Sequence, residues 1–145
     1  MTAPPPNSLA SSLPSSDRGS LTIISMFLLV IALSGAALIV DGGRALAARR
    51  HAANTAEAAA RFAVADQSLT GGFDENLAVA VARSHAQRSG VDAGDVTVAI
   101  RTDQAGRPEV VVTVTEHPTT VFLVLGGRAD MTVRATGAAT FVYSI

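Results

Sequence analysis

The longest apolar run in the chain extends from Leu21 to Val40, 20 residues without a single charge. As an α-helix this run is about 30 Å long, which matches the hydrocarbon core of a bilayer. Twelve of its residues are Leu, Ile, Val or Phe, and together they favour insertion by roughly 4 to 7 kcal/mol. We therefore predict a transmembrane helix over residues 21–40.

Two other interpretations of this run stay open. A buried core helix would need a large surrounding protein, which a chain of 145 residues does not supply. A secretory signal peptide would be cut after small residues, and Ser34, Gly35 and Ala36 are small. The apolar region of a signal peptide, however, is usually about 7–15 residues long. Ahead of the run, residues 1–20 are rich in proline, serine and glycine and predict a disordered tail.

After Val40 the chain becomes polar but keeps a helical character as far as about Gln67. Alanine, the best helix former, dominates this stretch, and Glu57 and Arg61 stand at i,i+4 in the favourable order. Small residues recur every four positions at Ala48, Ala52, Ala56 and Ala60. Such a ridge allows another helix or a sheet to approach closely. Because alanine is abundant here, chance alignment is the alternative explanation.

Further along, the pattern predicts a second helix and then strands. Asp74 is an N-cap candidate and Gly90 a natural helix end. From Asp95 the apolar period changes to two. It predicts strands over residues 95–101, 109–117 and 131–143, with a turn over 102–108 and an ambiguous apolar stretch, helical turn or strand, over 119–127. Residues 41–145 therefore predict one small α+β domain with an antiparallel sheet of about three strands.

The composition and charge exclude several classes of site and partner. A net charge of −1 gives no reason to expect a nucleic acid partner. The absence of cysteine excludes a disulfide framework, a thiolate zinc site and a cysteine nucleophile. The three histidines, His51, His85 and His117, are far apart without a carboxylate at ligand spacing, so we expect them to be structural.

No phosphate loop, zinc motif or nucleophile elbow is present. We expect no catalytic residue, no metal, no cofactor and no small-molecule substrate, and thus no enzyme. The aspartates beside the apolar run and the sheet, Asp17, Asp41 and Asp130, are expected to be caps or boundary charges.

The order of features resembles a known family. Arg18-Gly19-Ser20 directly precedes the apolar helix, and VDGGRALAARRHAANTAEAAARFA follows it. This arrangement is similar to the N-terminal segment of TadE/TadG-like proteins of the Tad (Flp) pilus system. The resemblance covers about residues 17–65, a third of the chain.

The resemblance implies a minor pilin, pseudopilin or assembly factor with a cytoplasmic N-terminus and an extracytoplasmic domain. It implies membrane lipid and other TadE/TadG-like or pilin subunits as partners, packed through their N-terminal helices. A prepilin peptidase would cut at Gly19-Ser20. Type IV pilin-like helices usually carry a glutamate five residues after the cut, where this chain has Ile24. A stationary assembly factor therefore stays open beside a filament subunit.

The distribution of arginines favours the opposite membrane topology. Only Arg18 precedes the helix, whereas Arg44, Arg49 and Arg50 follow it, so the positive-inside rule alone would place the domain in the cytoplasm. We follow the resemblance, because its members share these arginines. The alternative function is a membrane-tethered extracytoplasmic binding or sensory domain unrelated to pili.

Overall fold

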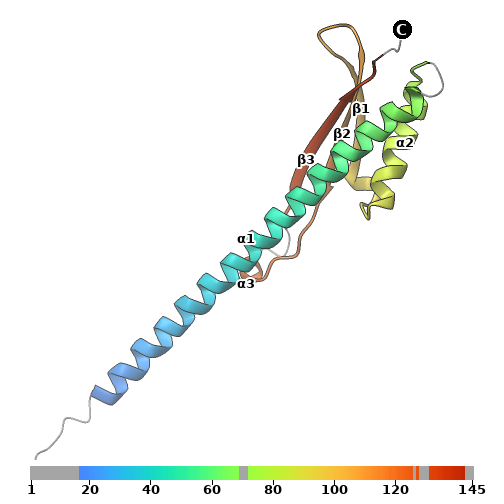
Figure 1. Ribbon diagram of the computed structural model, residues 1–145. Coiled ribbons are helices and arrows are strands. Elements are labelled where there is room, and N and C mark those ends of the chain that lie inside the picture. The colour runs from blue at the N-terminus through green and yellow to red at the C-terminus, as the bar shows by residue number, and fades with distance from the viewer. Residues whose placement is uncertain (1–16, 69–71, 126, 128–130, 143–145) are drawn as a thin grey trace, which may run out of the picture. The chain divides into compact units, whose positions relative to one another are not determined.

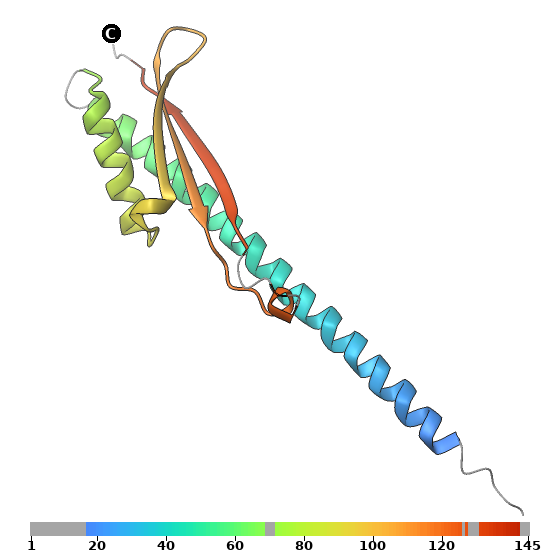
Figure 2. The ribbon, with the colours of Figure 1, turned by 180° about the vertical axis from the view of Figure 1, so that it is seen from behind.

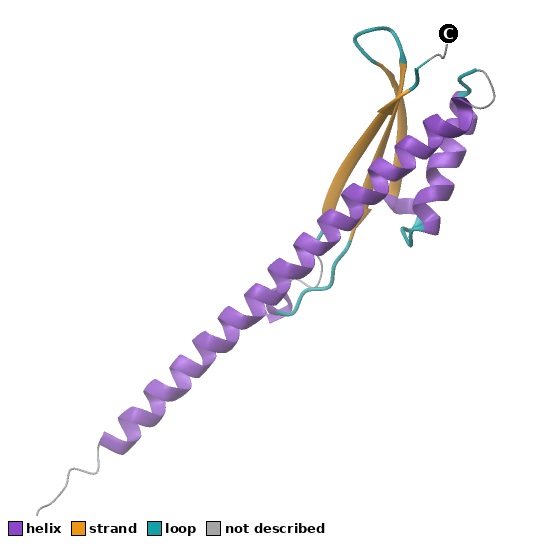
Figure 3. Cartoon of the chain, in the orientation of Figure 1, coloured by secondary structure: helices purple, strands orange, loops and turns teal. Residues whose placement is uncertain are grey.

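The computed structural model describes residues 17–68, 72–125, 127 and 131–142 (Figures 1 and 3). Its elements in chain order are α1 (Asp17–Ser68), α2 (Glu75–Arg88), the short 3-10 helix η1 (Ala93–Asp95), β1 (Val96–Thr102), β2 (Pro108–Glu116), α3 (Phe122–Leu125) and β3 (Val133–Thr140). The chain divides into two compact units, Met1–Ala36 and Ala37–Ile145. Each unit is described by itself.

Helix α1 is 52 residues long and includes both the predicted membrane helix and the alanine-rich stretch after it. It begins at Asp17, so residues 17–20 are helical although they were predicted to belong to a disordered tail. The rest of that tail, residues 1–16, lies outside the described residues. Gly42 and Gly43 do not interrupt the helix, because their alanine-rich surroundings favour helix strongly enough to offset two glycines.

Helix α2 has the two ends that the sequence predicted. The Asp74 side chain accepts hydrogen bonds from the backbone N–H groups of Asn76 at 2.8 Å and Leu77 at 3.1 Å. At the other end Gly90 has a φ of +90°, and the N–H groups of Gly90 and Val91 bond back to the carbonyls of Gln87 and Ala86. This is a Schellman motif, in which glycine relieves the strain of the left-handed conformation.

The three strands form an antiparallel sheet, as predicted, and their order in it is β1-β2-β3. The register pairs Val98 with Val112 and Val112 with Gly137. The predicted ambiguous stretch 119–127 contains one helical turn, α3, and β3 is shorter than its predicted range. Tyr143, the last residue of that predicted range, lies outside the described residues.

The core forms where α1 and α2 cover the sheet, as Figures 1 and 2 show from opposite sides. The helices contribute almost only alanine, and the sheet contributes valine. The fully buried members are Ala52, Ala56, Ala59, Ala60, Ala63, Ala78, Ala82, Ala86, Val110, Val112 and Val114. Small helix side chains facing branched strand side chains let the two layers approach closely.

The closest approach is at Gly137 in β3. A Cβ atom added there would lie 2.5 Å from the carbonyl carbon of Ala56 and 2.6 Å from the Cα of Glu57. These are backbone atoms of α1, which cannot rotate away as a side chain can. Glycine is therefore required here by packing, since its own φ is ordinary.

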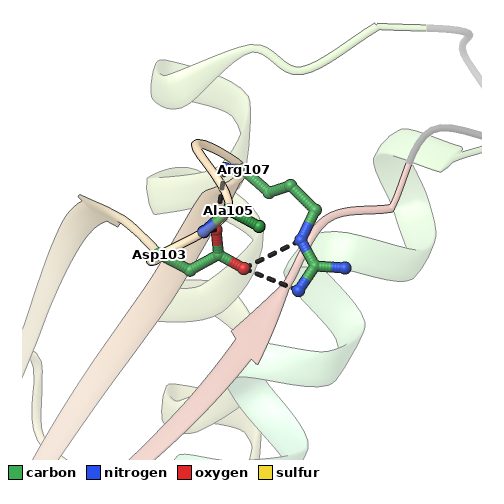
Figure 4. A network of polar contacts seen from close by, with 3 residues as sticks. All are labelled: Asp103, Ala105 and Arg107. Carbon is green, nitrogen blue, oxygen red and sulfur yellow. Dashed lines mark hydrogen bonds and ion pairs between the residues drawn. The ribbon is translucent and has the colours of Figure 1, made fainter.

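The β1–β2 hairpin closes through one aspartate (Figure 4). The Asp103 carboxylate accepts from the backbone N–H groups of Ala105 and Arg107, both at 2.8 Å, and pairs with the Arg107 guanidinium at 2.7 Å. Gly106 takes the positive φ, +77°, that the turn requires. Hydrogen bonds from Arg107, first from its backbone and then from its side chain, hold the pKa of Asp103 below its ordinary value.

Candidate functional site

The apolar part of α1 exposes almost all its large side chains. Its most apolar 18-residue window has a mean hydropathy of 2.8, and none of that window is buried. The exposed side chains include Leu21, Ile23, Ile24, Met26, Phe27, Leu28, Leu29, Val30, Ile31, Leu33, Leu38, Ile39 and Val40. Among the described residues this is the one helix long and apolar enough to cross a membrane.

A surface of this kind is not stable in water, because each large apolar side chain costs about 1.5–3 kcal/mol when left exposed. The buried core helix considered from the sequence does not fit, since nothing in the described residues covers this window. Inside the run, the Ser34 hydroxyl has a local partner, since it donates to the carbonyl of Val30 at 2.8 Å. The segment is that of a single-pass membrane protein.

Asp41, the first residue after the apolar run, is only 2 % exposed. Its carboxylate accepts three backbone hydrogen bonds from the segment that opens α3: from Val121 at 2.6 Å, from Phe122 at 2.7 Å and from Leu123 at 3.2 Å. These are the N–H groups that the first turn of a helix leaves without a partner. Asp41 therefore caps a helix that lies 80 residues away in sequence.

Charge and burial act in opposite directions on this carboxyl, which lies outside the predicted span. Burial away from water raises the pKa of Asp41, but the three backbone donors and the nearby Arg44 outweigh it and hold that pKa below its ordinary value. Arg44 also reaches the same segment, with its Nη1 3.5 Å from the carbonyl oxygen of Thr119. We name the contacts of Asp41 and Arg44 with residues 119–123 the junction.

The four alanines predicted to form a ridge all lie inside the domain. Ala52, Ala56 and Ala60 are fully buried and Ala48 is 9 % exposed. The sheet of the same chain covers them, with Gly137 against Ala56. The ridge is thus used within the chain, and packing of a partner subunit along it stays a prediction that these contacts do not test.

The predicted processing residues, Gly19 and Ser20, lie in the first turns of α1, and both are exposed. They belong to the first compact unit, and the ridge belongs to the second. Cleavage between them stays a prediction.

Two histidines have carboxylate partners that the sequence did not reveal. Nδ1 of His51 contacts Oε1 of Glu116, and Nε2 of His117 lies 3.2 Å from Oδ1 of Asp95. The partners are 65 and 22 residues apart in sequence, so no local spacing could show them. The third, His85, stacks on Phe62 with ring centroids 4.3 Å apart.

Both pairs line a pocket of about 310 Å³ between α1, the end of β2 and the loop before β1. The pocket is open to solvent rather than enclosed. Within the described ranges, no group of three or more His, Asp or Glu side chains could hold a metal ion. The pairs connect α1 to the sheet and the loop, and we assign them a structural role.

The comparisons with known proteins agree with these features. Residues 19–66, 48 of the 145, match the model of a family described as putative Flp pilus-assembly TadE/G-like. The match includes the apolar run, Asp41 and Arg44 of the junction, and the four alanines. Neither the curated proteins nor the solved structures gave a match. The resemblance expected from the sequence is thereby confirmed over this segment.

Proposed function

We propose that this chain, which carries a TadE/G-like segment at residues 19–66, is a minor pilin or pseudopilin-like structural or assembly component of a Tad (Flp) pilus. The family match supports a pilus-related component. One observation supports the finer role: the matched helix has two parts with opposite surroundings. Its residues beyond Ala48 are built into the domain, whereas residues 21–40 expose their apolar side chains.

The exposed part leaves a surface for lipid and for the helices of other subunits. Association between membrane helices depends on side-chain packing rather than on the hydrophobic effect, because lipid tails are as apolar as leucine. Binding of a partner helix would therefore depend on the sizes and positions of the side chains in residues 21–40. A mere tether would need only their hydrophobicity.

This difference gives the test. The gene for this chain would be deleted in a strain that normally makes Tad pili. Surface pili would then be counted without complementation, with the native chain, and with a chain whose residues 21–40 are replaced by 20 leucines. We expect the native chain to restore pili and the polyleucine chain to fail, although both reach the membrane. Full restoration by polyleucine would show that residues 21–40 act only as a tether, and normal piliation without the chain would overturn the proposal and favour a binding or sensory domain unrelated to pili.

We further propose that the N-terminus is cytoplasmic and the domain extracytoplasmic. Alkaline phosphatase fused after Ile145 reports this directly, because its disulfides form only outside the cytoplasm. We expect activity. A stable but inactive fusion, together with an active fluorescent protein at the same position, would place the domain in the cytoplasm, as the arginine distribution alone suggests.

Processing at Gly19-Ser20 is a separate part of the proposal. Mass spectrometry of the mature N-terminus distinguishes the forms: a start at Ser20 indicates a processed pilin-like subunit, and a start at Met1 or Thr2 a stationary anchor. A start near Ala37 would indicate a cleaved signal peptide and would overturn the membrane anchor itself.

A further inference from the structure

The α3 segment exposes apolar side chains beside the end of the predicted membrane span. Val121 is 45 % exposed and Val124 is 50 % exposed, with Phe122 and Leu123 half-buried between them. Residues 121–125 read VFLVL and carry no polar side chain. A turn of this composition on the surface of a small domain is unusual unless something covers it.

The junction determines where this turn lies. The Val121 nitrogen is 2.6 Å from the Asp41 carboxylate, and Asp41 follows Val40, the last residue of the uncharged run. A helix rises about 1.5 Å per residue, so the start of α3 lies at the level where the span ends. Figures 1 and 2 both show α3 beside α1, far from the strand ends at the β1–β2 hairpin.

Three backbone N–H groups of this turn already have hydrogen-bond partners within the chain, as an apolar environment requires. In lipid, an N–H group without a partner costs several kcal/mol. Asp41 supplies a partner for the N–H groups of Val121, Phe122 and Leu123. The apolar side chains can then face lipid without bringing three unpaired donors with them.

We propose that the α3 turn, residues 121–125, is a second membrane contact that lies in the boundary between headgroups and acyl chains. The occupant is lipid rather than a protein, because the span ends with the exposed apolar side chains of Leu38, Ile39 and Val40 directly before Asp41, and α3 begins at the level of Asp41. This inference requires the membrane span but not the pilus role, and it applies whichever leaflet the domain faces.

The test uses a single tryptophan, since the chain has none. The full-length Val124→Trp variant would be reconstituted in phosphatidylcholine vesicles, with and without phosphatidylcholine brominated on its acyl chains. We expect blue-shifted emission and loss of most of that emission in the brominated vesicles. The Val121→Trp variant repeats the measurement at a second position, in case one substitution disturbs the turn.

Val142 provides the matched control, as an exposed valine at 58 %. It follows β3, and Gly137 of β3 already lies against Glu57, about 24 Å along α1 from Asp41. The Val142→Trp variant should emit as in water and resist quenching, and Leu29→Trp in the span should be quenched. If both α3 variants retain native circular dichroism and yet behave as Val142→Trp does, the proposal is overturned and α3 is free for a protein partner.

Discussion

Asp41 shows how one residue joins a membrane helix to the domain after it. A buried carboxylate is costly unless hydrogen bonds compensate the lost water, and here three backbone N–H groups do so. The same contacts fix α3 against α1. We therefore regard Asp41 of the VDGGRALAAR sequence as a positioning residue at the start of the domain.

Replacing Asp41 by alanine removes that cap. We expect the amide protons of Val121, Phe122 and Leu123 to exchange faster with solvent, while those in β2 stay protected. Hydrogen exchange of the detergent-solubilised chain, followed by mass spectrometry, measures this. Asp41→Asn keeps one of the two acceptor oxygens that the carboxylate uses, so it should lie between the native chain and Asp41→Ala. Unchanged exchange in both variants would show that α3 is held by other contacts.

Asp103 makes the stability depend on pH. Its pKa is lowered in the folded chain, so its stabilising effect is complete above the unfolded value, about 3.9, and is lost as the pH falls through the lower folded value. The denaturation midpoints of the native chain and Asp103→Asn should differ at pH 7 and converge as the pH falls below about 4. A difference that stays constant over this range would contradict the assigned role, because other carboxyls titrate in both proteins.

At the scale of elements, the contact between β3 and α1 depends on Gly137. Replacing it with alanine forces a methyl group against the backbone of Ala56 and Glu57. We expect a loss of about 1–3 kcal/mol in the free energy of unfolding, measured by denaturant titration of the purified chain. The neighbouring Ala138 is exposed, and Ala138→Ser should have little effect. Equal stability of the two variants would contradict the close contact.

The alanine face of α1 gives a second comparison within one helix. Ala56 is fully buried, whereas Ala47 is exposed. Leucine at position 56 should overpack the core by about 1–3 kcal/mol and increase proteolysis of the domain, while leucine at position 47 should not. If Ala56→Leu is as resistant as Ala47→Leu but loses its partner subunits, the ridge contacts partners rather than the sheet.

The helices and strands were predictable because their signals are local. The uncharged run, the Asp74 cap, the Gly90 end and the alternating valines each indicate structure over a few residues. The start of α1 was placed four residues late, since Asp17 to Ser20 contain poor helix formers that the following helix extends into. The stretch 119–127 was ambiguous because its helical turn depends on Asp41, 80 residues earlier.

The candidate site was less predictable, because its contacts join residues that are far apart in sequence. The ridge alanines were identified from their spacing. The contact of Ala56 with Gly137 of β3 was not, because a glycine in a strand does not indicate which helix it will meet. The pairs His51–Glu116 and His117–Asp95 likewise depend on chain folding rather than on spacing.

At the scale of the whole molecule, the two compact units differ in how their apolar side chains are placed. The first contains most of the exposed apolar run, and the second has its own core of alanine and valine. A core of such small side chains buries little area per residue, so contacts at the membrane and with other subunits would add stability that the domain lacks alone. This expectation follows from the proposed function.

We propose that residues 21–40 pack against the helices of other pilus subunits within the membrane. A photo-cross-linking amino acid placed at each position from Leu21 to Val40, one per variant, tests it in cells that make the pilus. We expect cross-links to subunit proteins that recur every three to four positions, the repeat of one helix face. Cross-links to lipid alone at every position, with the variants expressed and inserted, would contradict it.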